Sequence, residues 1–159
     1  MNTPLGAYLE ELKTNKSQVS NITGITTDRI NALSHEDSAI QYADEVYPII
    51  YVANYLSNIS DDKFDSAIDR IFPNRVKNLL TDKLKDLSPA AQLFGYHTFQ
   101  RKDVETETKI PLGKLSKYMS DKKKRAPIEE VINFIDSLGL DLLTTLQKYY
   151  GVIDISSIT

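Results

Sequence analysis

Apolar and polar residues along the chain follow mainly the three- and four-residue spacing of amphipathic helices. Near the N-terminus, Leu5, Tyr8, Leu9 and Leu12 fall on one face of a helix. The same spacing recurs in most of the later segments. The pattern therefore predicts an all-α fold.

The first half of the chain is expected to form four short helices. Thr3 suits the N-cap of the first helix, because proline follows at the first helical position. Gly24 suits a left-handed C-cap that ends the second helix. Thr26 can cap the third. The expected ranges of the second, third and closing helices are 17–23, 27–33 and 44–56.

An internal repeat is the most informative feature of the sequence. A shift of 85 positions lays residues 3–53 on residues 88–138 without a gap. Identity is low, but most matches fall on apolar or capping positions, as a shared fold requires. The matched pairs include Thr3 with Ser88, Val19 with Val104, Ile30 with Leu115, Glu45 with Glu130, and Ile50 with Ile135.

The second copy is expected to repeat the helices of the first. Its first helix follows Ser88 and carries Ala90, Leu93 and Phe94 at helical spacing. The later helices are expected over 102–108, 111–119 and 128–138. The helix over 111–119 should bury Leu115 together with Met119 or Tyr118.

A helical connector is expected between the copies. Ser60 should begin a helix that presents Phe64, Ile68 and Ile71 on one side and ends at Pro73. A second connector helix carries Val76, Leu79, Leu80, Leu84 and Leu87. After residue 151, alternating apolar residues leave two possibilities open for the tail, a short strand or disorder.

Residues 16–34 have the spacing of a helix-turn-helix motif. Gly24 is followed by Ile25 and Thr26, and the inward apolar positions of the next helix are Ile30 and Leu33. In these residues the stretch resembles the Xre, or lambda-repressor-like, family, and the resemblance covers about residues 3–56. The second copy, 101–119, is a degenerate match.

The departures of the second copy concern its turn and its helix packing. Lys109 stands where the family has the turn glycine, and Glu105 stands where it has a small residue between the helices. In the first copy that small residue is Ser20. The resemblance implies two lambda-repressor-like domains joined by a helical connector. The predicted organisation is domain 1 at 1–57, the connector at 58–87, domain 2 at 88–151 and a tail at 152–159.

The resemblance also implies which residues meet DNA. A helix fits the major groove, and the second helix of the motif faces the base edges. In the first copy Arg29 would pair with guanine and Asn31 with adenine. The full set for this copy is Lys16 and Ser17 at the phosphate backbone, with Thr27, Asp28, Arg29, Asn31 and Ala32 at the groove.

The equivalent residues of the second copy are richer in lysine and suit phosphate better than bases. Arg101 and Lys102 would meet the backbone, and the outward face comprises Leu112, Gly113, Lys114, Ser116 and Lys117. The run Lys122, Lys123, Lys124 and Arg125 follows in the next loop. This run is either a solvated loop or a contact to the backbone, and both interpretations stay open.

Charge is distributed unevenly. The net charge of −3 taken as a whole disfavours nucleic acid. Residues 1–58 hold 3 basic and 7 acidic side chains, a net of −4, whereas residues 88–151 hold 10 basic and 8 acidic side chains, a net of +2. The positive charge is therefore local to the second copy.

Several classes of protein are not expected. The chain has no cysteine, which excludes disulfides, thiolate nucleophiles and cysteine-based zinc sites, and His35 and His97 are far apart in sequence. There is no phosphate-binding glycine loop, metalloprotease motif or nucleophile elbow. We expect neither an enzyme nor a bound cofactor or metal. No apolar run approaches the roughly 18 residues of a membrane span, and the N-terminus lacks signal-peptide features, so a cytoplasmic protein is expected.

The sequence thus predicts a sequence-specific regulator that binds double-stranded DNA. The two copies would read two half-sites, or one copy would read DNA while the other dimerises. A homodimer could also form through the connector or through the tyrosine-rich closing segment with Tyr42, Tyr47, Tyr51 and Tyr55. The alternative is a protein-interaction adaptor or antitoxin-like partner that has the fold without strong DNA affinity.

Overall fold

The computed structural model describes residues 2–75, 85–97, 110, 114–121, 123–153 and 155. This part of the chain is helical, with one isolated antiparallel bridge and no strand, which confirms the all-α prediction. None of its helices is long and apolar enough to cross a membrane. The elements are α1 (Pro4–Glu11), α2 (Lys16–Thr23), α3 (Thr27–His35), α4 (Ala43–Leu56), the 3-10 helix η1 (Asp61–Lys63), α5 (Phe64–Ile71), α7 (Pro89–His97), α9 (Lys114–Ser120), α10 (Ile128–Ser137) and α11 (Leu142–Tyr150).

Three helix ends of the first unit, α1 to α4, are fixed by residues that the sequence indicated. The Thr3 hydroxyl accepts a hydrogen bond from the Gly6 N–H at 3.1 Å. The Thr26 hydroxyl does the same for the Arg29 N–H, also at 3.1 Å. Gly24 ends α2 with a φ of 77°, a left-handed conformation that glycine adopts without steric cost. These three cap predictions are confirmed.

The inward faces of these short helices form one apolar core. Leu5, Val19, Ile30 and Leu33 are fully buried. Helix α1 lies against α3, and α2 packs on both α3 and α4. Burial of such side chains stabilises the fold by about 1.5–3 kcal/mol each, and short helices depend on this packing because they are marginal alone.

The connector begins after Ser60 with the 3-10 helix η1 and becomes α-helical only at Phe64, so the predicted helix starts later than expected. Its apolar side is confirmed, because Phe64, Ile68 and Ile71 are buried on one side of α5, which ends at Ile71 before the C-cap Phe72 and Pro73. Helix α5 packs against α1 and α4 rather than standing apart from the first unit. The predicted second connector helix lies outside the described residues except for positions 85–87.

The second unit, α7 with α9 and α10, matches its prediction in part. The Ser88 hydroxyl accepts from the Ala91 N–H at 3.2 Å, as an N-cap residue would. Helix α9 is described from Lys114 onward. On α9, Leu115 and Tyr118 are half-buried and Met119 is 66% exposed, so Tyr118 is the one of the two predicted alternatives that turns inward. The predicted helix over 102–108 lies outside the described residues.

A helix that the sequence analysis did not predict follows α10. Asp141 caps α11, and its carboxylate accepts from the Thr144 N–H at 3.0 Å. The hydrogen bonds from the side chain and from the backbone of Thr144 lower the pKa of Asp141. Leu142 and Leu146 are buried on its inner side. The signals were present in the sequence as a capping aspartate, apolar residues four apart and Gly151 at the end of the helix.

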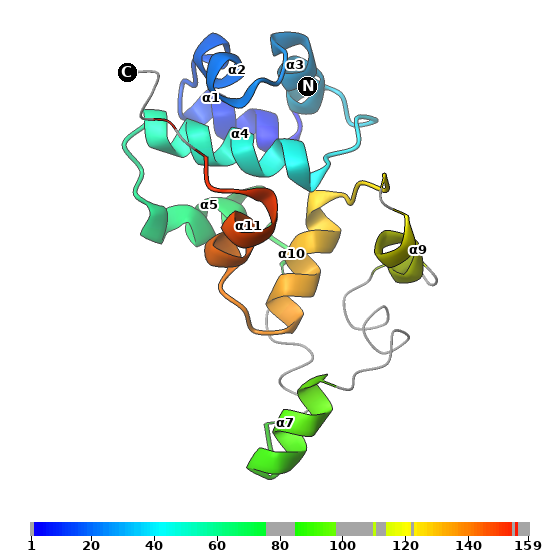
Figure 1. Cartoon of the computed structure of the whole chain (residues 1–159). Helices are drawn as coiled ribbons and strands as arrows, with labels where there is room; N and C mark the ends of the chain where they lie inside the picture. The colour runs from blue at the N-terminus through cyan, green and yellow to red at the C-terminus, as the bar shows by residue number, and fades with distance from the viewer. Residues whose placement is uncertain are drawn as a thin grey trace.

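A single apolar core joins the first unit to the end of the chain. Helix α10 packs against α4, and α11 packs against α5 (Figure 1). The buried residues Ile128, Ile132 and Leu146 belong to the same cluster as the core of α1 to α5. The tail also contributes to this core, because Ile155 is buried in the cluster. The described residues of the tail form no strand.

A buried ion pair fastens α10 to the connector. The side chains of Arg75 and Asp136 are 3% and 2% exposed, and Arg75 Nη2 donates to Asp136 Oδ1 at 2.8 Å. Asp65 and Asp69 of α5 also accept from this guanidinium. Burial by itself lowers the pKa of Arg75, but the hydrogen bonds to Asp136 and Asp65 outweigh it and raise the pKa.

The two repeat units meet through a local twofold arrangement. The Ala43 N–H donates to the Ala126 carbonyl at 2.9 Å, and the Ile128 N–H donates to the Gln41 carbonyl at 2.7 Å. Under the 85-residue shift, Ala43 corresponds to Ile128 and Gln41 corresponds to Ala126. Each bond is therefore the repeat equivalent of the other. Between them, Tyr42 and its own repeat equivalent Pro127 form the antiparallel bridge. Such an exchange of equivalent contacts characterises an isologous interface, here formed within one chain.

Candidate nucleic-acid interface

The outer face of α3 is accessible. Ile30 and Leu33 point into the core, while Thr27, Asp28 and Asn31 are exposed and Ala32 is half-buried. Helix α3 follows α2 across the Gly24 turn (Figure 1). The structure therefore leaves the face that the sequence assigned to the DNA groove uncovered by the described part of the chain.

Lys16 lies beside this face. Its Nζ donates to Asn31 Oδ1 at 2.9 Å and lies 3.4 Å from His35 Nε2. Ser17, next to it at the start of α2, is exposed. The structure thus brings together a residue predicted for the backbone and one predicted for a base. The lysine uses one lone pair of the Asn31 oxygen, which leaves the second lone pair as an acceptor and the amide nitrogen as a donor.

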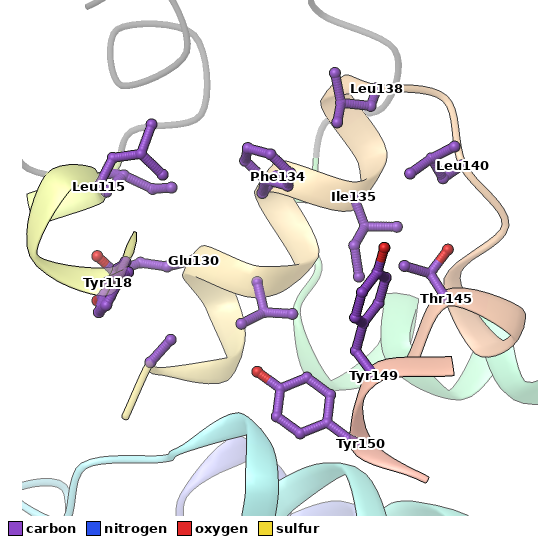
Figure 2. A pocket seen from close by; sticks show the side chains of 13 residues that line it. Leu115, Tyr118, Glu130, Phe134, Ile135, Leu138, Leu140, Thr145, Tyr149 and Tyr150 are labelled. Atoms are coloured by element: carbon purple, nitrogen blue, oxygen red, sulfur yellow. The ribbon is translucent and has the colours of Figure 1, made fainter. Parts of the chain in front are cut away.

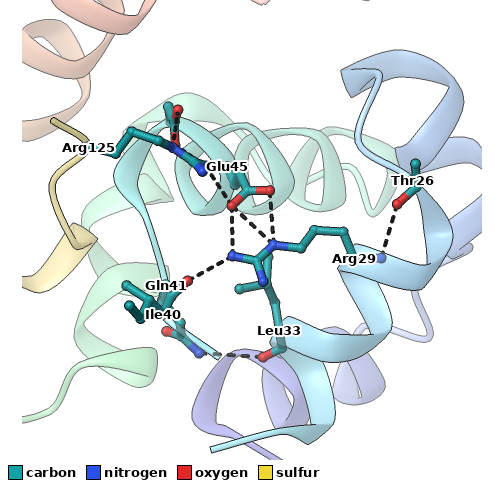
Figure 3. Close-up of polar contacts among 8 residues, drawn as sticks. Thr26, Arg29, Leu33, Ile40, Gln41, Glu45 and Arg125 are labelled. Carbon is teal, nitrogen blue, oxygen red and sulfur yellow. Dashed lines mark hydrogen bonds and ion pairs between the residues drawn. The ribbon is translucent and has the colours of Figure 1, made fainter. Parts of the chain in front are cut away.

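Arg29 is turned inward against α4. Figure 3 shows its guanidinium facing Glu45, with Nη2 donating to Oε1 at 2.9 Å and Nε donating to Oε2 at 3.1 Å. Nη2 also donates to the Ile40 carbonyl at 3.0 Å. The bonds to Glu45 raise the pKa of Arg29. To reach guanine, Arg29 would have to leave these partners.

The second unit repeats this ion pair at equivalent positions. Lys114 Nζ donates to Glu130 Oε2 at 3.0 Å, and the 85-residue shift places Lys114 on Arg29 and Glu130 on Glu45. The Tyr118 hydroxyl donates to the same carboxylate at 2.7 Å. Burial by itself lowers the pKa of Lys114, but its hydrogen bonds to Tyr118 and Glu130 outweigh burial, so the pKa is raised overall. Both units therefore join the third helix to the closing helix with a cation and a glutamate.

Arg125 links the basic loop to the first unit. Its Nη2 donates to Glu45 Oε1 at 2.8 Å and to Asp44 Oδ1 at 2.9 Å. Its guanidinium carbon lies 4.0 Å from the centre of the Tyr42 ring, within the range of a cation–π contact. Glu45 consequently accepts from two arginines, one from each repeat unit.

The remaining residues predicted to contact DNA are either exposed, part of α9, or outside the described residues. Lys117 on α9 and Lys123 and Lys124 in the loop before α10 are exposed. Ser116 lies within α9. Arg101, Lys102 and Lys122, with Leu112 and Gly113, lie outside the described residues. The described cations that are free to meet phosphate thus belong mainly to the second unit.

Sequence reasoning missed the acidic partners of two predicted DNA-binding cations, Arg29 and Lys114. Glu45 and Glu130 were aligned by the repeat, but their pairing with residues sixteen positions earlier was not inferred. The available signal was a cation at each of these earlier positions, Arg29 and Lys114. No group of three or more potential metal ligands occurs among the described residues.

Comparison with family models, with curated proteins and with solved structures found no match to this chain. The resemblance to the Xre family therefore stays an expectation that rests on the residues quoted above.

Proposed function

We propose that the chain is a sequence-specific regulator that binds double-stranded DNA with two unequal helix-turn-helix units. One observation carries this proposal. Helix α3 follows a glycine turn from α2, keeps Ile30 and Leu33 in the core, and leaves Thr27, Asp28 and Asn31 exposed. That arrangement suits a helix that enters a major groove.

The local twofold contact suggests the form of the DNA site. In helix-turn-helix dimers the symmetry of the operator mirrors that of the protein. The exchange of hydrogen bonds between residues 41–43 and 126–128 favours two half-sites in inverted orientation. The half-sites should differ in sequence, because Asn31 is an amide whereas its equivalent, Ser116, is a hydroxyl.

The two units would contribute in different ways. The first carries the base reader Asn31, held by Lys16. The second carries the exposed cations Lys117, Lys123 and Lys124. Since each neutralised phosphate contributes about −0.9 to the slope of log K against log salt, three contacts would give a slope of about −2.7.

A binding assay at two salt concentrations tests the proposal. Fluorescence anisotropy with a duplex selected from a random pool should show that Asn31→Ala loses preference for the selected sequence, by about 5- to 150-fold, as expected for one bidentate contact. Lys117→Ala should weaken binding to all duplexes and make the salt slope shallower by about 0.9. Lys63→Ala, an exposed lysine on η1, is the matched control and should change neither quantity.

A specific observation favours the protein-interaction adaptor as a second candidate. Arg29 is held by Glu45 within the chain, and the net charge of residues 1–58 is −4. An unchanged anisotropy with every duplex at low salt would exclude the regulator and favour the adaptor.

A further inference from the structure

An apolar cavity of about 600 Å³ opens in the second unit. Figure 2 shows Phe134 and Ile135 of α10 between Leu115 of α9 and Tyr149 of α11. Val131 also lines the cavity. Its size lies within the range of ligand pockets, but the repeat identifies a different kind of occupant.

The lining residues are the repeat equivalents of core residues in the first unit. Leu115 corresponds to Ile30, Phe134 to Ile49 and Ile135 to Ile50. These equivalents in the first unit are all fully buried. They are covered there because α1 packs on α3 and α5, and α2 packs on α3 and α4. The cavity is therefore the place where the second unit would receive its own first helices.

Helix α7 carries exposed apolar side chains that could fill the cavity. Its Leu93 and Phe94 are 56% and 66% exposed. Their equivalents on α1, Tyr8 and Leu9, are 5% and 1% exposed. In Figure 1, α7 stands away from the other helices. Among the described residues, the second unit thus holds both an exposed apolar helix face and a cavity lined by apolar side chains.

We propose that α7 docks reversibly into the cavity formed by α9, α10 and α11, in the manner in which α1 closes the first unit. The chain length permits this within one molecule. In sequence, Leu93 and Leu115 are 22 positions apart, as are their equivalents Tyr8 and Ile30. The proposed occupant is therefore a segment of the same chain.

One substitution in the repeat explains why this docking is reversible. A Cβ atom on Gly6 of α1 would lie 2.0 Å from the Ser34 carbonyl oxygen, so α1 approaches α3 at a distance that only glycine allows. The equivalent of Gly6 on α7 is Ala91. The extra methyl group keeps α7 farther from α9, which weakens the docked state.

A disulfide experiment on the full chain tests the proposal, because the chain has no cysteine of its own. Thr3 and Ser34 adjoin in the first unit, where the Thr3 N–H donates to the Ser34 carbonyl at 2.9 Å. Their equivalents Ser88 and Met119 are exposed. The pair Ser88→Cys and Met119→Cys should therefore be close enough to form a disulfide when α7 is docked.

Mild oxidation at micromolar concentration should give a disulfide within the monomer, at least about tenfold faster than in the control pair Ser88→Cys and Lys63→Cys. Adding Ala91→Gly should increase the rate further. Adding Leu93→Glu with Phe94→Glu should reduce it to that of the control pair.

Three results would overturn docking within the chain. They are a rate no higher than that of the control pair, disulfide-linked dimers alone, and a crosslink that persists after Leu93→Glu with Phe94→Glu. The experiment contains no DNA, so its failure would leave the proposed function untouched.

Discussion

Glu45 and Glu130 occupy equivalent places in the two units, but their surroundings differ. Glu45 accepts from Arg29 through both oxygens and also from Arg125. Glu130 accepts from Lys114 and Tyr118 through one oxygen, and its other oxygen is buried without a hydrogen-bond partner among the described residues. In the part of the chain that the structure describes, the glutamate of the first unit is thus more fully paired than the glutamate of the second.

This difference indicates how a degenerate repeat can stay folded. The second unit packs α10 against α4 of the first unit, and α11 against α5. The described helices of the second unit therefore share a core with the first unit. Substitutions at the contacts between the two units should reveal this dependence.

Loss of the ion pair between the connector and α10 should have the largest effect. Asp136→Ala leaves the buried Arg75 guanidinium without its buried partner, so the free energy of unfolding should fall by about 3–5 kcal/mol. Urea denaturation measures this change. The double variant Arg75→Met with Asp136→Leu should recover much of the loss, because apolar residues can replace a buried pair. A loss below about 1 kcal/mol for Asp136→Ala would show that α10 does not depend on this contact.

Exchanging glycine and alanine between the units should have effects of unequal size. Alanine normally favours a helix over glycine by about 1 kcal/mol. Gly6→Ala should nevertheless destabilise the protein by about 2–3 kcal/mol, because its Cβ would overlap the Ser34 carbonyl. Ala91→Gly should change the free energy of unfolding by no more than about 1 kcal/mol. Thermal unfolding of both variants checks the contrast, which equal effects would refute.

The two glutamates should differ in their contribution to stability. Glu45→Gln weakens charge-assisted bonds to two arginines and should cost about 2–3 kcal/mol. Glu130→Gln affects one lysine and one tyrosine and should cost about 1 kcal/mol. Chemical denaturation of the two variants side by side provides the comparison. A larger loss for Glu130→Gln would reverse the interpretation of which unit is better built.

Alkaline pH should weaken the shared core through Tyr47. Burial raises the pKa of Tyr47 from 10.0 to about 12, and its hydroxyl donates to the Gly151 carbonyl at 3.0 Å. Because the folded state holds this proton more tightly, the stabilisation is complete below pH 10 and is lost as the pH rises through about 12. Stability measured from pH 9 to 12 should fall less steeply in Tyr47→Phe, which should cost about 1 kcal/mol at neutral pH. An unchanged slope would show that Tyr47 does not control the alkaline transition.

Local features of the fold could be predicted from the sequence because they depend on neighbouring residues. Thr3, Thr26 and Gly24 cap their helices through contacts within three or four positions. The apolar stripe of α5 follows from its helical period. Helix α11 was missed although Asp141 and Leu146 carried the same kinds of signal.

Features that depend on distant residues could not be predicted in the same way. The inward turn of Arg29 is decided by Glu45 and the Ile40 carbonyl, which reach it only after α4 has packed. The repeat indicated two similar units, but neither periodicity nor charge showed that Tyr42 would face Pro127. Whether the predicted contact residues bind DNA likewise depends on a partner outside the chain.

The arrangement of half-sites tests the central claim most directly. The full chain should be used to select duplexes from a random pool at low salt, and the selected sequences should be compared for orientation and spacing. The account predicts enrichment of two unequal half-sites in inverted orientation, with centres about 34 Å apart, which is one turn of the DNA helix. Enrichment of direct repeats, or no enrichment at all, would contradict it.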